Sequence, residues 1–375
     1  MEEYFGIDSI KNLKRILDKT KAKSIFLIKC KGSYESSGAK EKLCSLLKDY
    51  NVAYFSDFEV NPKIDDVKKG ISLFMENSYD IVVSIGGGSV IDMGKLINIF
   101  AAQNDEITGY VRKERNIKNK GKPFVAIPTT SGSGSEATHF AVVYIDKTKY
   151  SVEDKCILPD YCIVDPQLTM KLPPYITAST GMDALCQAIE SYWCVNSTDT
   201  SKLYAKEAIK LIMANISEAV NNPSEKSRVA MAKAAHLAGK AINITKTTTP
   251  HAISYPITSY FGVPHGHAVS LTLGKVMVYN YQVNEDNVLD AKGADYVKKT
   301  IDELCNILKV NDINSANNKI NGLMQEIGLK TNLTELGIKA EDIKLIVKKS
   351  NLERMKNNPR ITTEQDLIKM LEEIL

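Results

Sequence analysis

Residues 81–95 have the sequence IVVSIGGGSVIDMGK, in which a run of mainly β-branched residues leads into three glycines and then into a helical pattern. The apolar run Ile81–Ile85 predicts a buried strand, and Ser89–Ala101 predicts the helix that follows it, with Ser89 as a cap. Strand, glycine turn and helix in this order are typical of an α/β protein. Free N–H groups at a helix start attract anions, so the turn is a candidate phosphate site. The alternative is a plain turn that only connects the strand to the helix, since glycine clusters are common in such turns.

The same alternation extends over the first 166 residues. Apolar runs predict further strands at Ser24–Ile28, Val52–Phe55 and Phe124–Ile127. Amphipathic stretches predict helices at Ala39–Asp49 and Ile64–Asn77. Strands that are apolar along their whole length and separated by helices indicate a parallel sheet with both faces covered.

The pattern becomes mainly helical after Pro166, as in Ala205–Val220 and Val229–Ile244, with few candidate strands. A chain of 375 residues fits two domains at roughly 100–200 residues each. We therefore expect an α/β domain at residues 1–166 and an all-α domain at residues 167–375.

Composition excludes several classes of protein. The 48 basic and 45 acidic residues give a net charge of +3, and the basic residues are spread along the chain, so neither nucleic acid nor a membrane surface is indicated as a partner. No apolar run approaches the ~20 residues of a membrane-spanning helix, and the acidic N-terminus does not resemble a signal peptide. Seven cysteines without a CxxC pair are typical of free thiols in a reducing compartment. We expect a cytoplasmic protein.

A second polar loop, PTTSGSGSE at residues 128–136, follows the predicted strand Phe124–Ile127. Hydroxyl and backbone N–H donors among glycines can surround a pyrophosphate or a ribose. The alternative is a flexible linker, which the apolar runs on both sides make less favourable. Because parallel sheets bind ligands beyond the carboxyl ends of their strands, the two loops together favour a nucleotide site, although neither has the GxGxxG pattern.

The histidines and one acidic helix indicate a metal site. Three of the five histidines, His251, His265 and His267, fall within 17 positions. Asp183 and Gln187 lie four apart in an apolar helical pattern, where an acid is costly to bury unless it is paired or binds a metal. Structural histidines, and an aspartate placed near a helix start by the helix dipole, are the alternatives.

Five segments in this order resemble the iron-containing alcohol dehydrogenase family over essentially the whole chain. They are GGGSVIDMGK, PTTSGSGSEAT, LPDYCIVDPQL, GMDALCQAIESY and PHAISYPITSYFGVPHGHA. The resemblance implies an NAD(P)-dependent oxidoreductase of alcohols and aldehydes, with a dinucleotide-binding domain at 1–166 and a helical metal-binding, catalytic domain at 167–375. It also implies a homodimer and a fold shared with dehydroquinate synthase.

The resemblance assigns site residues by position. Asp183, His251 and His265 match metal ligands, and Gln187 stands where the family usually has a further histidine. Fe²⁺ is the metal that the family favours, with Zn²⁺ next. The positions assigned to the dinucleotide are Gly86, Gly87, Gly88, Ser89, Asp92, Thr129, Thr130, Ser133 and Lys149.

The implied chemistry is hydride transfer from NADPH or NADH to an aldehyde whose oxygen the metal polarises. Tyr255, or His267 through a water molecule, is the expected proton donor, and the sequence does not choose between them. The segment after the predicted strand Ser24–Ile28 contains Lys31 and Ser33 and no acidic residue that would repel the 2′-phosphate of NADPH. We therefore expect NADPH to be accepted at least as well as NADH.

Within the family, the chain most resembles phosphonoacetaldehyde reductases, which would place it in phosphonate metabolism. Lys246, in the segment NITKTTT at 243–249, is the expected substrate-binding residue, because its charge and the neighbouring hydroxyls suit a phosphonate. A polar loop that ends a helix is the alternative for this segment. The alternative functions are a dehydrogenase of uncharged short-chain alcohols, a lyase like dehydroquinate synthase and a non-catalytic homologue.

Overall fold

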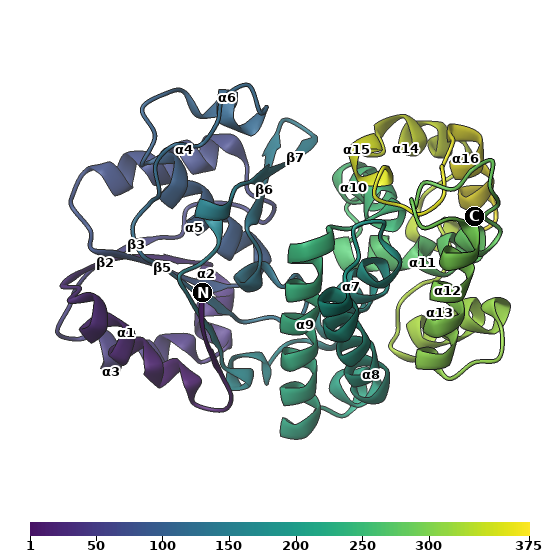
Figure 1. Ribbon diagram of the computed structural model, residues 1–375. Coiled ribbons are helices and arrows are strands. Elements are labelled where there is room, and N and C mark those ends of the chain that lie inside the picture. The colour runs from purple at the N-terminus through teal and green to yellow at the C-terminus, as the bar shows by residue number, and fades with distance from the viewer. The chain divides into compact units, whose positions relative to one another are not determined.

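The computed structural model describes residues 1–375 (Figure 1). Its first unit, Met1–Leu172, is built on a six-stranded sheet. The strand order is β1-β8-β5-β4-β2-β3, and every neighbouring pair is parallel. The strands are β1 (Glu2–Phe5), β2 (Ser24–Lys29), β3 (Asn51–Phe55), β4 (Ile81–Gly86), β5 (Phe124–Pro128) and β8 (Tyr161–Val164). The predicted parallel sheet is confirmed; the edge strand β1 and the strand β8 were not predicted.

Helices cover both faces of this sheet. They are α1 (Asn12–Thr20), α2 (Lys31–Ser36), α3 (Ala39–Leu47), α4 (Ile64–Met75), α5 (Gly88–Phe100) and α6 (Ile107–Val111). Alternate side chains of β2 separate the two layers: Phe26 packs with residues of α4 and α5, whereas Ile25 packs with residues of α1 and α3. This double burial explains why the central strands are apolar at nearly every position, with the buried Ser84 of β4 as an exception.

An antiparallel hairpin of β6 (Phe140–Ile145) and β7 (Thr148–Glu153) follows β5. The sequence did not predict it. Its strand β6 lies against α5, and the backbone N–H of Val142 in β6 donates to the carboxylate of Asp92 in α5 at 3.0 Å. The hairpin is therefore attached to the helix that follows the glycine turn.

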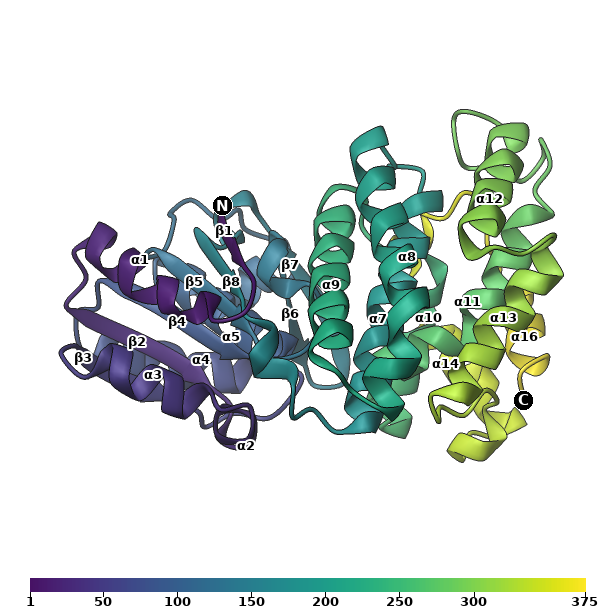
Figure 2. The same cartoon turned by 90° about the horizontal axis from the view of Figure 1, so that it is seen from below.

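The second unit, Pro173–Leu375, is all helical apart from one isolated bridge, as predicted. Its helices are α7 (Pro174–Trp193), α8 (Asp199–Asn221), α9 (Glu225–Thr245), α10 (Thr249–Phe261), α11 (His265–Tyr281), α12 (Ala294–Leu308), α13 (Ile313–Glu326), α14 (Ile343–Lys349), α15 (Leu352–Met355) and α16 (Glu364–Glu372). The central helix is α7, which packs against α8, α9 and α11 (Figure 2). None of the helices combines the length and the apolar character needed to cross a membrane.

Candidate active site

The sheet of the first unit has a topological switch point between β2 and β4. From β2 the chain continues outward to β3, whereas from β4 it continues outward to β5 on the other side. The two strands end together, because Lys29 of β2 is in register with Ile85 of β4. Parallel sheets bind ligands beyond the carboxyl ends of their strands at such a point. Gly86 is the last residue of β4 and Gly87–Ser89 follow it, and Lys31, an exposed residue, lies after β2.

The glycine turn (residues 86–88) and the polar loop at residues 128–136, called the serine/threonine loop below, lie against each other. Thr129 N–H donates to the carbonyl of Gly86 at 2.9 Å, because β4 and β5 are neighbours in register. A Cβ atom on Gly87 would lie 3.4 Å from the Thr130 side chain, and one on Gly88 would lie 2.5 Å from Ser133 Oγ. A Cβ at position 87 would make only an ordinary contact, whereas glycine at position 88 is what lets the two loops approach closely. The structure thus brings the predicted dinucleotide residues of both loops to one edge of the sheet.

The cap of α5 differs from the sequence prediction. The helix begins at Gly88 with Gly87 as the N-cap, and no side chain caps it. Ser89 Oγ instead accepts a hydrogen bond from the backbone N–H of Asn61 at 3.1 Å. The helix therefore starts before the serine, directly after β4, and no side chain satisfies its first backbone N–H groups.

Asp92 and Lys149, the other predicted dinucleotide residues, lie on α5 and β7 of the first unit. Asp92 is buried, and its carboxylate accepts hydrogen bonds from Ser135 Oγ at 2.5 Å and from Val142 N–H at 3.0 Å. Lys149 is half-buried on β7, opposite Tyr144 of β6. The carboxylate of Asp92 is thus occupied by protein donors on both of its oxygens.

In the second unit, three side chains that are far apart in the sequence form a cluster of metal-binding type. Asp183 comes from α7, His251 from α10, and His265 is the first residue of α11. One donor atom from each lies within 4.8 Å of the others. His251 Nε2 is 3.4 Å from Asp183 Oδ1, and the two histidine rings are 5.4 Å apart between centroids. Two imidazoles and one carboxylate suit Fe²⁺ or Zn²⁺, and three protein ligands leave a position open for substrate, as catalytic sites do.

The packing of α11 on α7 brings His265 to Asp183. A Cβ atom on Gly266 would lie 2.0 Å from the carbonyl oxygen of Ser179 and 2.8 Å from Asp183 Cβ. Any larger residue at position 266 would push α11 away from α7 at the point where the ligands meet. The glycine after His265 is therefore part of the geometry of the cluster.

Glu190 is a site residue that the sequence reasoning missed. It is fully buried on α7, and its Oε1 is hydrogen-bonded to His251 Nδ1. Its Oε2 accepts from Thr248 N–H at 2.6 Å and Thr248 Oγ1 at 2.9 Å, and Thr248 Oγ1 in turn accepts from Trp193 Nε1 at 3.0 Å. A histidine whose Nδ1–H donates a hydrogen bond to a carboxylate has a free lone pair on Nε2, and this lone pair can bind a metal.

The spacing of Glu190 in the sequence carried a signal for this role. Glu190 follows Asp183 by seven residues, which is about two helical turns, so both face the same side of α7. Burial lowers the pKa of His251, but Glu190 and Asp183 outweigh burial and raise this pKa to about 9. The two carboxylates make the cluster electronegative, as a cation site requires.

The other residues predicted for this site have different surroundings. Gln187 is buried on α7, one turn after Asp183. Tyr255 is buried on α10, with its ring centroid 6.0 Å from that of His265. His267 is also buried, but its Nδ1 bonds to the Tyr175 hydroxyl at 3.1 Å and its Nε2 to the carbonyl of Lys330 at 2.8 Å. Of the two expected proton donors, Tyr255 lies next to a ligand, whereas His267 has protein partners on both ring nitrogens.

Lys246 ends α9 in an unusual backbone conformation. Its φ of 69° and ψ of −178° fall in a region that almost only glycine adopts. Its N–H donates to the Ile242 carbonyl at 2.8 Å, and its carbonyl accepts from Thr245 Oγ1 at 2.9 Å. The neighbouring threonines are buried: Thr245 Oγ1 also bonds Ser191 Oγ at 3.0 Å, and Thr248 bonds Glu190. The threonine hydroxyls thus hold the helices together.

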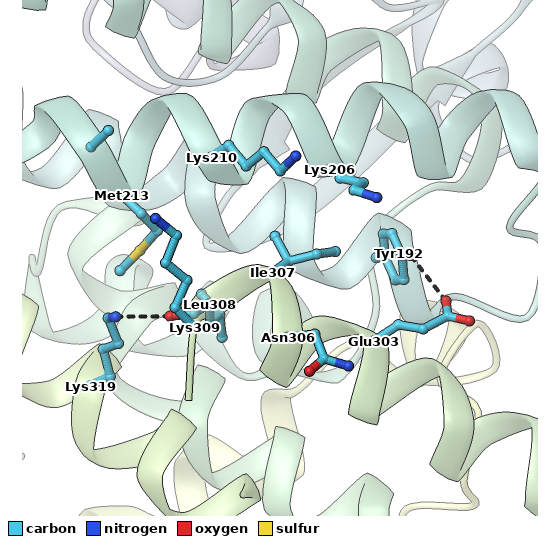
Figure 3. A pocket seen from close by; sticks show the side chains of 11 residues that line it. Tyr192, Lys206, Lys210, Met213, Glu303, Asn306, Ile307, Leu308, Lys309 and Lys319 are labelled. Carbon is cyan, nitrogen blue, oxygen red and sulfur yellow. Dashed lines mark hydrogen bonds between the residues drawn. The ribbon is translucent and has the colours of Figure 1, made fainter. Parts of the chain in front are cut away.

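A surface cavity of about 1050 Å³ lies elsewhere in the second unit (Figure 3). Residues of α7, α8, α12 and α13 line it, among them Tyr192, Lys206, Lys210 and Glu303. Tyr192 follows Asp183 by nine residues, which at about 100° per residue places it on the opposite side of α7. The cavity contains none of the predicted site residues and is separate from the metal-ligand cluster.

Comparison with known proteins agrees with the fold and with the cluster. Residues 2–166 match the model of the iron-containing alcohol dehydrogenases, and residues 177–375 match the C-terminal model of the same family. The chain is 32% identical over 346 residues to the NAD-dependent methanol dehydrogenase of Bacillus methanolicus, covering 91% of this chain and 89% of the relative. It is 37% identical over 233 residues to long-chain-alcohol dehydrogenase 1 of Geobacillus thermodenitrificans, where the match spans 61% of this chain and 59% of that relative.

A solved structure is similar over the full length. The sulfoacetaldehyde reductase of Bifidobacterium kashiwanohense, in complex with NAD⁺, is 30% identical, with a TM-score of 0.89 and coverage of 100% of this chain and 96% of that one. The family models together span almost all of the chain. The chain therefore belongs to the iron-containing alcohol dehydrogenase family, and it is an NAD(P)-dependent oxidoreductase that acts on alcohols and aldehydes.

Proposed function

We propose that this enzyme reduces a short anionic aldehyde, with phosphonoacetaldehyde as the first candidate and 2-hydroxyethylphosphonate as its product. The observation that carries the proposal is Lys246, a cation held in a strained backbone conformation in the unit that contains the metal-ligand cluster. We further propose a dinucleotide-binding domain at 1–166, a catalytic domain at 167–375, a homodimer and a place in the cytoplasm.

The residues of the two units have separate tasks in this proposal. Asp183, His251 and His265 hold a divalent ion, Fe²⁺ first and Zn²⁺ second, which supplies Lewis acidity toward the aldehyde oxygen. Gln187 stands in or beside this ligand set, one turn after Asp183. Glu190 holds His251 in the orientation that presents Nε2 to the cluster. Tyr255, whose ring lies against His265, is the preferred proton donor to the product oxygen.

The proposed dinucleotide site is the edge of the sheet. Gly86–Ser89, together with Thr129, Thr130 and Ser133, would bind the phosphates and ribose through backbone N–H groups and hydroxyls. Lys149 would lie near the nicotinamide ribose, and Lys31 would give the 2′-phosphate of NADPH a positive partner. Asp92 belongs to this site through the loop that it holds rather than through a contact of its own.

Lys246 has two properties of a functional residue. A non-glycine residue in this backbone region costs about 1–3 kcal/mol, and such positions gather at functional sites. Its ammonium group can form charge-assisted hydrogen bonds with an anionic substrate, at roughly 1.5–3 kcal/mol each. A bond of this strength would favour an anionic aldehyde over a neutral one of similar length by about 10-fold to 150-fold in kcat/KM.

The relative of known structure supports this substrate class. It is a sulfoacetaldehyde reductase, and sulfoacetaldehyde resembles phosphonoacetaldehyde in carrying an anionic group on the carbon next to the aldehyde. The second candidate is an uncharged aldehyde such as butanal. The matches to a methanol dehydrogenase and to a long-chain-alcohol dehydrogenase favour it, because both act on uncharged alcohols.

The test compares kcat/KM for phosphonoacetaldehyde, sulfoacetaldehyde and butanal in the wild type, Lys246→Ala and Lys233→Ala. Lys233 is the control, since it lies on the same helix α9 but pairs with Glu207 on the surface. We expect the wild type and Lys233→Ala to prefer the anionic aldehydes, and Lys246→Ala to lose that preference. Equal efficiencies for phosphonoacetaldehyde and butanal in the wild type would reject the anionic substrate, and a preference that survives Lys246→Ala would remove Lys246 from its binding.

A further inference from the structure

Helix α5 carries a lysine that the proposed reaction does not use. Lys95 is only 1% exposed, although a lysine is rarely buried without strong partners. Its Nζ donates to the carbonyls of Ser135 at 2.6 Å, Thr138 at 2.8 Å and Phe140 at 2.9 Å, and lies 3.1 Å from Thr138 Oγ1. Burial lowers the pKa of Lys95 to about 8, while Asp92 opposes this shift. The amine therefore serves as a buried clamp on one short segment of backbone.

Asp92 holds the same segment from one turn earlier in α5. Its carboxylate accepts from Ser135 Oγ and from the N–H of Val142. Ser135 is thus held twice, through its carbonyl by Lys95 and through its hydroxyl by Asp92. The two side chains together fix the end of the serine/threonine loop and the start of β6 to α5.

The clamped segment continues directly into the proposed dinucleotide contacts. Ser133 lies two residues before Ser135 and packs against Gly88, where a Cβ atom would come within 2.5 Å of Ser133 Oγ. Beyond the bond from Thr129 N–H to the Gly86 carbonyl, residues 130–134 contain no helix or strand, so the ladder bonds that fix regular structure are absent from this part of the loop. A loop without its own ladder must be held by side chains if it is to keep its shape before the ligand arrives.

We propose that Lys95 and Asp92 are positioning residues that set residues 129–135 in the shape that binds the dinucleotide, without touching the dinucleotide themselves. This inference rests on the proposed function, in which Thr130 and Ser133 contact the cofactor. Without the clamp, the loop samples other shapes, and the fraction of molecules ready to bind falls. The affinity for NAD(P)H then decreases, while the metal-ligand cluster of the second unit keeps its composition.

The experiment measures the dissociation constant of NADPH by fluorescence titration, together with metal content and melting temperature. The test variants are Lys95→Met, which keeps the length of the side chain but removes the amine, and the milder Asp92→Asn. The matched control is Asn98→Leu, because Asn98 also lies on α5 and binds backbone, but outside the serine/threonine loop. Its Nδ2 donates to the carbonyl of Lys122 at 2.8 Å, and its Oδ1 accepts from the N–H of Lys122 at 2.9 Å. Thr130→Val reports separately on the proposed direct contact.

Loss of a buried partner costs about 1–3 kcal/mol, so Lys95→Met is expected to raise the dissociation constant by about 5-fold to 150-fold. Asp92→Asn should act in the same direction, and Asn98→Leu should lower the melting temperature without weakening NADPH binding. KM for NADPH should rise with little change in kcat at saturation, in KM for the aldehyde or in metal content.

Three outcomes would overturn the inference, and they separate it from the proposed function. If Thr130→Val weakens NADPH binding but neither Lys95→Met nor Asp92→Asn does, the loop is the cofactor site and the clamp has no positioning role. If Asn98→Leu weakens binding as much as Lys95→Met, the effect is one of general stability. If none of the four variants changes the dissociation constant, the assignment of the cofactor to this loop fails as well.

Discussion

Replacement of Glu190 by glutamine is expected to weaken metal binding without removing a metal ligand. Glu190 accepts hydrogen bonds on both oxygens, from His251 Nδ1 on one and from Thr248 N–H and Oγ1 on the other. A glutamine amide can accept on only one side. If its NH₂ faces His251, the proton must move to Nε2, the atom that points toward Asp183, and that nitrogen can no longer bind a metal.

The opposite orientation of the amide is also unfavourable. If the NH₂ of the introduced glutamine faces Thr248, it can donate to Thr248 Oγ1, but the backbone N–H and the hydroxyl proton of Thr248 both lose their buried acceptor. An unsatisfied buried donor costs about 1–3 kcal/mol, which corresponds to a loss of about 5-fold to 150-fold in metal affinity. This range agrees with the ~10-fold to 100-fold effects found when carboxylates behind metal-binding histidines are removed.

The assay is competition with a chelator of known affinity, followed by elemental analysis of the protein. Glu303→Gln is the control, because Glu303 accepts from the Tyr192 hydroxyl at 3.0 Å on the opposite side of α7 (Figure 3). We expect this control to keep the wild-type metal affinity. An unchanged metal affinity in Glu190→Gln, with the protein folded, would refute the orientation argument.

Three further predictions follow from the geometry of the site. Gly266→Ala should lower metal affinity and the melting temperature, because its Cβ would lie 2.0 Å from a backbone carbonyl oxygen. The control Gly322→Ala on α13, where a Cβ would have no atom within 4 Å, should be neutral or stabilise the protein by up to ~1 kcal/mol. Equal behaviour of the two variants would contradict this prediction. His265→Ala should lose metal and activity together, and full metal content by elemental analysis would show that His265 is not a ligand. Lys246→Gly should gain up to ~2 kcal/mol of stability by relieving its backbone strain, yet lose efficiency with an anionic aldehyde; thermal unfolding that matches the wild type would contradict the strain.

Cofactor preference is the prediction that depends least on the structure. Lys31 is exposed at the start of α2 and has no acidic neighbour in the segment 29–33. NADPH should therefore give a kcat/KM at least equal to that of NADH, and Lys31→Ala should lower the value for NADPH alone. A value for NADH well above that for NADPH would contradict this reasoning.

The amino-acid sequence alone was enough to predict the central strands, the main helices and the motifs, but not β1, β8 or the hairpin of β6 and β7. Strands such as Ile81–Gly86 are visible as short apolar runs, and helices such as Ala39–Leu47 as apolar residues at helical spacing, so both signals lie within a few residues. The metal-binding residues could be named because Asp183, His251 and His265 stand in recognisable motifs, and the structure brings all three within 4.8 Å. Signals of this kind lie within short segments, so they can be recognised without knowledge of the fold.

Which side chains meet depends on how the helices and strands pack together. Glu190 and His251 are 61 residues apart, and Lys95 reaches Ser135 across 40, so no local period encodes either contact. The threonine hydroxyls near Lys246 are a further example. The sequence predicted that they bind the substrate, whereas in the structure they form hydrogen bonds to residues of neighbouring helices. A buried polar group must find a partner wherever the packing places one, and packing depends on the whole chain rather than on neighbouring residues.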